Sequence, residues 1–286
     1  MSSLKDLSLR IGSVKSTQKI TSVMKSLSAS KLYPAQRKLN DGNSYHQSIS
    51  SVLNELLLQR DIDSRPQLRG NTKLLIVMLA DKGLCGGFNG SIAKKLIQYI
   101  AQNGSDNLKI IGFGNKIKQV LKQHSDLLLQ TIPISKIAFN NVVKVYNEQL
   151  KDILYSKYHS IEVIYHKFAG FSGEKEVAID DIFNFSNNNS DDNNSIIEKK
   201  LDDDYASTLK VTMDMYIVSK IYNAILNSIA SEHLERMLAM ENANNNALDM
   251  IKDLSLQYNR MRQANITKEL IEIISGSGAM EATTNE

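Results

Sequence analysis

The residues with the most evident chemical potential lie in one glycine-rich stretch. Between Asp81 and Gly90 the sequence reads Asp-Lys-Gly-Leu-Cys-Gly-Gly-Phe-Asn-Gly, directly after a run of apolar residues. A glycine loop between a strand and a helix can hold a phosphate on its backbone N–H groups. The spacing fits neither G-x-G-x-x-G nor G-x-x-x-x-G-K-[ST], and no acidic partner follows about twenty residues on at the end of a second strand. The pattern favours tight-turn glycines over a nucleotide site.

The only cysteine of the chain, Cys85, lies in the same loop. A thiol becomes a nucleophile when a base activates it, but the five histidines are scattered and none is near in sequence. One cysteine excludes an intramolecular disulfide and fits a reducing compartment. No convergent set of acid, base and nucleophile appears, so we expect no catalytic, cofactor-binding or metal-ligating residues.

The elements around this loop alternate between strand and helix patterns. Leu74–Leu79 is a short continuous apolar run, which is typical of a buried strand. Further strands are predicted at 109–113, 161–168 and 177–183, and helices at 92–100, 117–121 and 138–158. This alternation predicts a small α/β domain with a largely parallel sheet.

Two long helices are predicted on either side of that domain. Tyr205 to Ser275 contains neither glycine nor proline, its apolar residues recur at three- and four-residue steps, and Gly276 provides a stop. The poor helix formers of 241–246 predict a kink or a partner contact there. Residues 3–58 predict a second helix, with a kink near Pro34 or a break near Gly42.

The charge is unevenly distributed. Residues 1–40 hold eight Lys or Arg against one acid, whereas residues 205–286 hold seven against ten, so the two long helices are expected to pair antiparallel. The basic face has no interleaved aromatic residues or base-reading motif, so we expect no nucleic-acid partner. No apolar run is long enough to span a bilayer, and the first residues show no signal-peptide core or transit peptide, so a soluble protein on the cytoplasmic side is expected.

These patterns divide the chain into five expected segments. They are an N-terminal coiled-coil helix (1–58), an α/β domain (72–185), a flexible Asn/Asp-rich loop (186–202), a C-terminal coiled-coil helix (203–276) and a tail (277–286).

Three ordered motifs, at both ends and in the middle, make the pattern specific. The first is Ser13–Thr21 with Met24 and Ala29-Ser30-Lys31, and the second is Gly83–Asn89. The third comprises Ser231-Glu232-His233, Arg236-Met237, Ala239-Met240, Tyr258-Asn259-Arg260, Arg262-Gln263-Ala264, Ile266-Thr267, Glu269–Ile273 and Ser275-Gly276. Together they closely resemble the gamma subunit of F-type ATP synthase, of bacterial type, over the whole chain.

The resemblance implies a central rotor stalk without catalytic residues of its own. In that family the terminal helices form an antiparallel coiled coil inside a ring of three alpha and three beta subunits. A Rossmann-like domain meets the epsilon subunit and the membrane c-ring. Proton flow turns the c-ring, and the turning shaft changes the conformation of the catalytic beta subunits. Membrane association would come only through the complex, as a peripheral subunit on the cytoplasmic face of the bacterial inner membrane.

The resemblance also assigns contact residues, all in this chain's numbering. Polar contacts to the alpha/beta ring are implied for Arg262, Gln263 and Thr267, and on the opposing helix for Met24, Lys19 and Lys25. The implied apolar shaft tip consists of Ile266, Leu270, Ile271, Ile273 and Ile274. The implied central loop near the beta C-terminal domains consists of Gly83, Leu84, Cys85, Gly86, Gly87, Phe88 and Asn89.

The sequence departs from the family pattern at a few places. Pro34 lies where the family continues an unbroken helix, and Ser26 and Ser28 replace larger or apolar residues. Residues 187–194 stand where related chains have an acidic, proline-containing segment at the c-ring, and no two-cysteine regulatory insertion is present. Two alternatives stay open: a nucleotide-dependent enzyme that uses the Gly83–Asn89 loop, and a coiled-coil scaffold unrelated to energy conversion.

Overall fold

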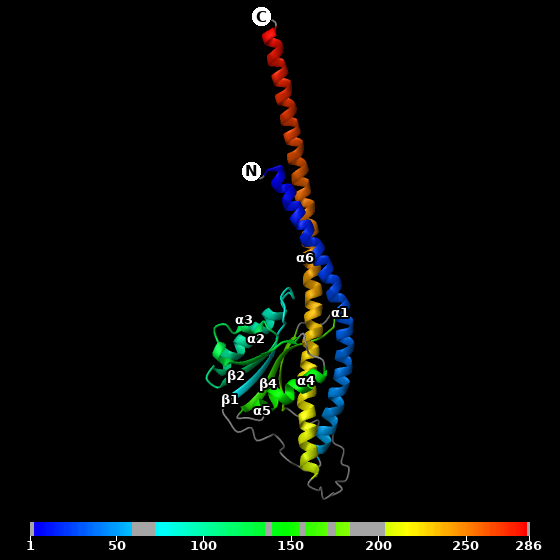
Figure 1. Ribbon diagram of the computed structural model, residues 1–286, viewed down its shortest axis with the longest axis vertical. Helices are drawn as coiled ribbons and strands as arrows, with labels where there is room; N and C mark the ends of the chain where they lie inside the picture. The colour runs from blue at the N-terminus through cyan, green and yellow to red at the C-terminus, as the bar shows by residue number, and fades with distance from the viewer. Residues whose placement is uncertain are drawn as a thin grey trace. The chain divides into compact units, whose positions relative to one another are not determined.

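The computed structural model of the chain (Figure 1) describes residues 3–58, 72–134, 139–154, 158–170, 176–183 and 204–284. Two compact units are present. One unit joins residues 1–27 to residues 237–286, and the other comprises residues 28–236. The predicted linker at 61–71 and the predicted loop at 186–202 lie outside the described residues.

The larger unit contains a five-stranded sheet, as the alternating pattern predicted. Its strands are β1 (Thr72–Met78), β2 (Leu108–Phe113), β3 (Leu128–Ile132), β4 (Tyr158–Lys167) and β5 (Glu176–Asp181). They lie in the order β3-β2-β1-β4-β5. The pairs β1–β2, β1–β4 and β2–β3 are parallel, and only β5 runs antiparallel to its neighbour β4. The expectation of a largely parallel sheet is confirmed.

The apolar run of β1 is continuous because both faces of the sheet are covered. Leu74, Ile76 and Met78 point into one buried cluster, whereas Leu75 and Val77 point into another on the opposite face. This alternation follows from the two-residue period of a strand. The second cluster is closed by α2 (Phe88–Asn103) and by the short α3 (Ile117–Val120).

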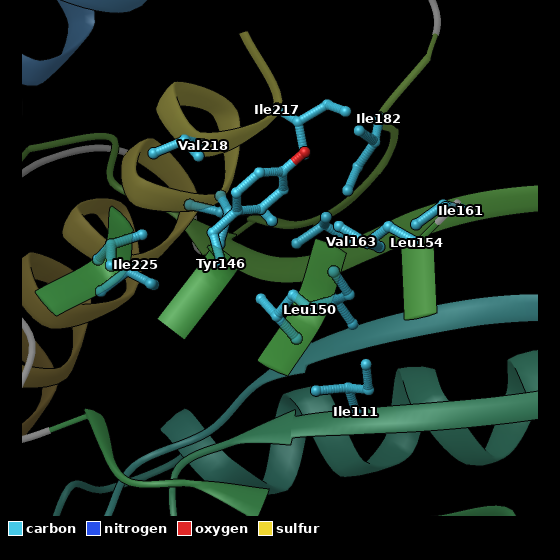
Figure 2. Packing of buried hydrophobic residues seen from close by; sticks show 14 of the residues in the cluster. Ile111, Tyr146, Leu150, Leu154, Ile161, Val163, Ile182, Ile217, Val218 and Ile225 are labelled. Atoms are coloured by element: carbon cyan, nitrogen blue, oxygen red, sulfur yellow. The ribbon is translucent and has the colours of Figure 1, made fainter. Parts of the chain in front are cut away.

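The first cluster is covered by a broken helical segment and by the two long helices. The segment consists of α4 (Phe139–Val145), a π-helical turn (Tyr146–Leu150) and α5 (Lys151–Leu154). Figure 2 shows Tyr146 and Leu150 from this segment facing Val163 of β4 and Ile217 of α6 (Asp204–Thr284). The prediction of one helix over 138–158 was wrong at its C-terminal end, because β4 begins at Tyr158.

A partly buried polar group anchors this segment to α6. The Tyr146 hydroxyl donates a hydrogen bond of 2.7 Å to Asp214 Oδ1, and Lys151 Nζ lies 2.6 Å from Asp214 Oδ2. The Asp214 carboxylate therefore has a donor or cation on each oxygen, which is what a partly buried charge requires.

The N-terminal helix α1 (Leu4–Leu58) is unbroken, so the expected break near Gly42 was wrong. Pro34 lies inside the helix, but Ala35 and Leu39 next to it are buried against Leu226 and Ala230 of α6. A Cβ on Gly42 would lie 2.6 Å from Leu226 Cδ1. Tertiary packing thus outweighs the local cost of proline, and the glycine permits close approach of two helices instead of a turn.

The C-terminal helix α6 also passes through its expected interruptions. It does not end at Gly276 but continues to Thr284, so the predicted stop was wrong. A glycine ends a helix when it adopts the left-handed conformation, whereas Gly276 lies inside the helix. The Asn-rich stretch 241–246 is helical as well.

Candidate functional site

The smaller unit contains an antiparallel helix pair. Lys25 Nζ of α1 lies 2.7 Å from Glu241 Oε1 of α6, and Gln18 Nε2 donates to Asn244 Oδ1 at 2.9 Å. Lower numbers on α1 therefore face higher numbers on α6. Among its described residues, the buried side chains of this unit are those of Leu7, Thr21, Met240, Ala247 and Leu254. Glu241 and Asn244 of the Asn-rich stretch therefore contact α1 of the same chain.

The pair ends before α6 does. Extending the register of the two polar contacts at the rise of a helix places Leu4, the first residue of α1, level with about residue 260 of α6. Every side chain from Arg262 to Ser275 is described and exposed. Figure 1 shows this end of α6, in orange and red, continuing past the N-terminal end of α1. We call the stretch Arg262–Ser275 the unpaired tail.

The unpaired tail has two chemically different faces. At roughly 100° per residue, the apolar residues of the implied shaft tip fall on one half of the helix, together with the polar residues of the implied ring contact. The opposite half contains Lys268, Glu269 and Glu272, and Lys268 Nζ lies 3.7 Å from Glu272 Oε1. The structure therefore brings Arg262, Gln263 and the apolar residues onto one exposed surface.

That surface is unusually apolar for an exposed helix. The tail residues with exposed large apolar side chains are Ile266 (49%), Leu270 (53%), Ile271 (58%), Ile273 (66%) and Ile274 (69%). A contiguous exposed apolar patch is a feature of protein contact sites. Within the part of the chain that the structure describes, none of these side chains is buried against α1 or the sheet.

The predicted residues of the opposing helix differ from one another. Lys19 is exposed and Met24 is half-buried, whereas Lys25 is engaged by Glu241. About 40% of each side chain of the Lys25–Glu241 pair is exposed, so the pair is worth little to stability and the lysine keeps an accessible side. The sequence did not predict Glu241 as the partner of Lys25. The two residues are 216 positions apart, so their contact can be predicted only when the register between the two helices is known.

The glycine loop in the larger unit is held rigidly from within. The Asn89 side chain accepts a hydrogen bond from Ala80 N–H at 3.0 Å and donates one to Cys85 Sγ at 3.1 Å. Leu84 has a φ of 60° and is 64% exposed. A non-glycine residue in the left-handed region is uncommon and costs free energy, so the surrounding contacts must impose it.

The third motif meets this loop in space. Arg236 of α6 donates to Gly83 O at 3.4 Å and lies 2.5 Å from Glu232 Oε1. Burial raises the pKa of the Glu232 carboxyl, and the Arg236 guanidinium opposes this shift. Both side chains are about 12% exposed, so the pair is shielded from solvent. Two motifs separated by about 150 residues therefore form one structural site.

The chemistry of the loop does not favour nucleophilic catalysis. The Cys85 thiol is buried, and burial together with Glu232 raises its pKa, so the reactive thiolate is disfavoured. Nearby, Ser91 Oγ lies 2.9 Å from His166 Nε2. The same Nε2 lies 3.0 Å from the carbonyl oxygen of Phe88, which can only accept. This nitrogen therefore donates to the carbonyl and has no lone pair with which to activate the serine.

Two further properties bear on function. The described residues contain no group of three or more His, Cys, Asp or Glu side chains arranged to hold a metal ion. Among the described helices, none combines the length and the apolar character that crossing a bilayer requires.

Comparison with known proteins gives one consistent family. Residues 3–280 match the family model described as ATP synthase. The ATP synthase gamma chain of Ehrlichia canis is 36% identical over 279 residues, covering 96% of this chain and 98% of that protein. The gamma chain of Geotalea uraniireducens is 32% identical over 287 residues, covering 98% and 100% respectively. That of Hyphomonas neptunium is 36% identical over 292 residues, with the same coverage.

Solved structures agree with this grouping. A chain of the Tetrahymena thermophila mitochondrial ATP synthase, in a structure of the central stalk and c-ring, matches with a TM-score of 0.59 and 25% identity, covering 78% of this chain and 99% of that one. A chain of the Euglena gracilis enzyme has the same TM-score at 18% identity, covering 90% and 97%, and supports the fold. Given the near full-length match to gamma chains from several bacteria, this chain belongs to the ATP synthase gamma-chain family.

Proposed function

We propose that this chain, a central-stalk subunit of an F-type ATP synthase, transmits torque through the unpaired tail while other subunits perform the catalysis. The observation that supports this role is the exposed apolar half of the tail next to Arg262 and Gln263. Exposing five large aliphatic side chains gives the isolated chain no stability, because their transfer free energy is gained only on burial. A surrounding protein surface would supply that burial.

Coupling requires more than a contact. A shaft changes the equilibrium between two conformations of a neighbouring subunit only if it binds them with different free energies. A helix with one apolar half and one charged half meets this condition, because each rotation presents a different surface to a fixed neighbour. In this proposal the ring of alpha and beta subunits also contacts four other residues, which are polar or half-buried. They are Thr267, Met24, Lys19 and Lys25.

The other parts of the chain take complementary roles in the proposal. The partners are three alpha and three beta subunits, an epsilon subunit and a membrane c-ring whose proton-driven rotation turns the stalk. The loop 83–89 approaches the beta subunits, with exposed Leu84 as its most prominent apolar group. The segments that transmit torque in this proposal are the helices 1–58 and 203–276 and the domain 72–185. The complex holds the chain peripherally at the cytoplasmic face of the bacterial inner membrane.

A nucleotide-dependent enzyme is the competing proposal for the glycine loop. Part of the backbone that a phosphate would need is already occupied, since Phe88 N–H donates to Cys85 O at 3.2 Å and Ser91 N–H donates to Gly87 O at 2.9 Å. Titration of the purified chain with ATP and with NAD tests this alternative directly. Stoichiometric binding in the low micromolar range would favour it.

The experiment that tests the stalk proposal is co-purification. The full chain, tagged at a position outside the tail and expressed in its own cell type, should recover alpha, beta and epsilon subunits in fixed stoichiometry. Recovery of the chain alone, or with an unrelated set of proteins, would favour the unrelated scaffold and contradict the proposal.

A further inference from the structure

Three aromatic side chains from separate helices surround one open pocket in the larger unit. They are Tyr45 of α1, Phe139 of α4 and Tyr222 of α6, and the pocket has a volume of about 310 Å³. The other described residues that line the pocket are Lys38, Asp41 and Gly42, all on α1. None of these residues belongs to the glycine loop, the helix pair or the unpaired tail.

The three aromatic rings contact one another through Phe139. The ring of Phe139 lies 5.6 Å from that of Tyr45 at an interplanar angle of 85°, and 5.1 Å from that of Tyr222 at 74°. Phe139 therefore packs edge to face against both tyrosine rings. Gly42 is buried and lines the pocket with its backbone, because it has no side chain.

The four lining residues of α1 lie on one face of that helix. Lys38, Asp41, Gly42 and Tyr45 follow at steps of three, one and three, so they share one stripe of the helix. Side chains three positions apart on a helix are neighbours, with about 5–6 Å between their Cβ atoms. An acidic and a basic group therefore lie side by side at the rim, both exposed.

The chemistry of this pocket selects a particular kind of ligand. The negative faces of aromatic rings attract a cation, and Asp41 adds a full negative charge. A primary ammonium gains less from the rings, because it is strongly hydrated and must give up water at its three N–H groups to lie between them. A trimethylated ammonium has no N–H donors and presents an apolar, positively charged surface. Lys38 can bind an anionic group attached a short distance away.

We propose that the pocket formed by Tyr45, Phe139, Tyr222, Lys38 and Asp41 binds a small zwitterion with a methylated ammonium and a carboxylate. The ammonium lies between the rings beside Asp41, and the carboxylate pairs with Lys38. This inference goes beyond the stalk function and does not depend on it, since every described residue that lines the pocket belongs to the larger unit.

The test uses glycine betaine as the probe on the full-length chain, followed by proton NMR. Saturable binding is expected, with an upfield shift of the N-methyl signal from the ring currents of the surrounding aromatic side chains. The matched control ligand is 3,3-dimethylbutanoate, which keeps the shape and the carboxylate but has carbon in place of the charged nitrogen. It should bind about tenfold more weakly. Equal affinity of the two, or no saturable binding of betaine, would overturn the proposal.

Variants locate the binding. Tyr222→Leu should weaken betaine binding about tenfold, and Asp41→Asn should weaken it several-fold without weakening the binding of the anionic 3,3-dimethylbutanoate. Asp41 is exposed, so its variant tests the pocket even if Tyr222→Leu does not fold. Tyr33→Leu is the matched control, because Tyr33 is an exposed tyrosine on the same helix and does not line the pocket. Unchanged affinity in Asp41→Asn, or an equal loss in Tyr33→Leu, would contradict the assignment.

Discussion

Two parts of helix α6 use the same residue type in opposite ways. Ile217, Ile221 and Ile225 are completely buried against the sheet and the broken helical segment, as Figure 2 shows for Ile217 and Ile225. In the unpaired tail, Ile273 and Ile274 are 66% and 69% exposed. The first group stabilises the fold of the chain itself. The second group has no such role within the described residues, so its apolar character points to burial in an assembly.

The largest expected effect comes from the buried group. Ile221→Ala should lower the free energy of unfolding by about 2–5 kcal/mol, because it removes apolar contacts and leaves a cavity. Urea denaturation of the full chain measures this change. The matched variant Ile273→Ala should change the free energy of unfolding by less than about 0.5 kcal/mol. A large loss in Ile273→Ala would show that the tail is packed within the chain and would remove the contrast.

The partly buried polar anchor at Asp214 should have the next largest effect. Asp214→Ala leaves the Tyr146 hydroxyl and the Lys151 ammonium without this acceptor, so we expect a loss of about 1–3 kcal/mol in unfolding free energy. Thermal and urea unfolding both report it. Asp214→Asn should be milder, because an amide oxygen can still accept from Tyr146. A neutral outcome for the alanine variant would mean that the broken helical segment is held by apolar packing alone.

Acid sensitivity should follow from His233, whose side chain is partly buried near the glycine loop. Burial, followed by the charges of Arg236 and Lys31, lowers the pKa of His233 from 6.5 to about 4. As the pH falls, His233 therefore binds a proton in the unfolded chain before it does so in the folded chain. Its contribution to the free energy of unfolding is fully present above pH 6.5 and is lost as the pH falls towards 4. In His233→Gln, the fall in the urea midpoint over this pH range should be smaller. If the urea midpoints of the parent and the variant depended on pH in the same way, His233 would not be a source of the acid sensitivity.

The smallest expected effect is at the Lys25–Glu241 pair. Lys25→Glu should cost at most about 0.5 kcal/mol in unfolding free energy, because both side chains are substantially exposed. The double exchange Lys25→Glu with Glu241→Lys should recover that loss. Failure of the exchange to recover stability would show that the two residues do not interact in solution.

The sequence predicted the strongly patterned elements and failed where tertiary contacts decide. β1 was predictable because every residue from Leu74 to Met78 is buried, whereas β3 was missed because Leu128–Ile132 is short, half-exposed and mixed in polarity. Pro34 and Gly42 looked like interruptions of a helix. Their neighbours pack against α6, a contact that no local pattern reveals.

The candidate site was predicted to a similar extent. The apolar residues of the tail and the loop 83–89 follow from motifs, and the structure gives them exposure and geometry. The contacts Lys25–Glu241 and Arg236–Gly83 could not be predicted, because each depends on the register between elements that are distant in sequence. The aromatic pocket was missed for the same reason, since its three rings come from three helices.

The central claim is that the exposed half of the tail acts on other subunits and not on the chain's own fold. The most direct measurement is ATP turnover by the intact complex assembled with Arg262→Ala and Gln263→Ala. We predict slower turnover with unchanged assembly and an unchanged unfolding midpoint of the chain. Unchanged turnover in intact complexes, or slower turnover explained by loss of the folded chain, would contradict the claim.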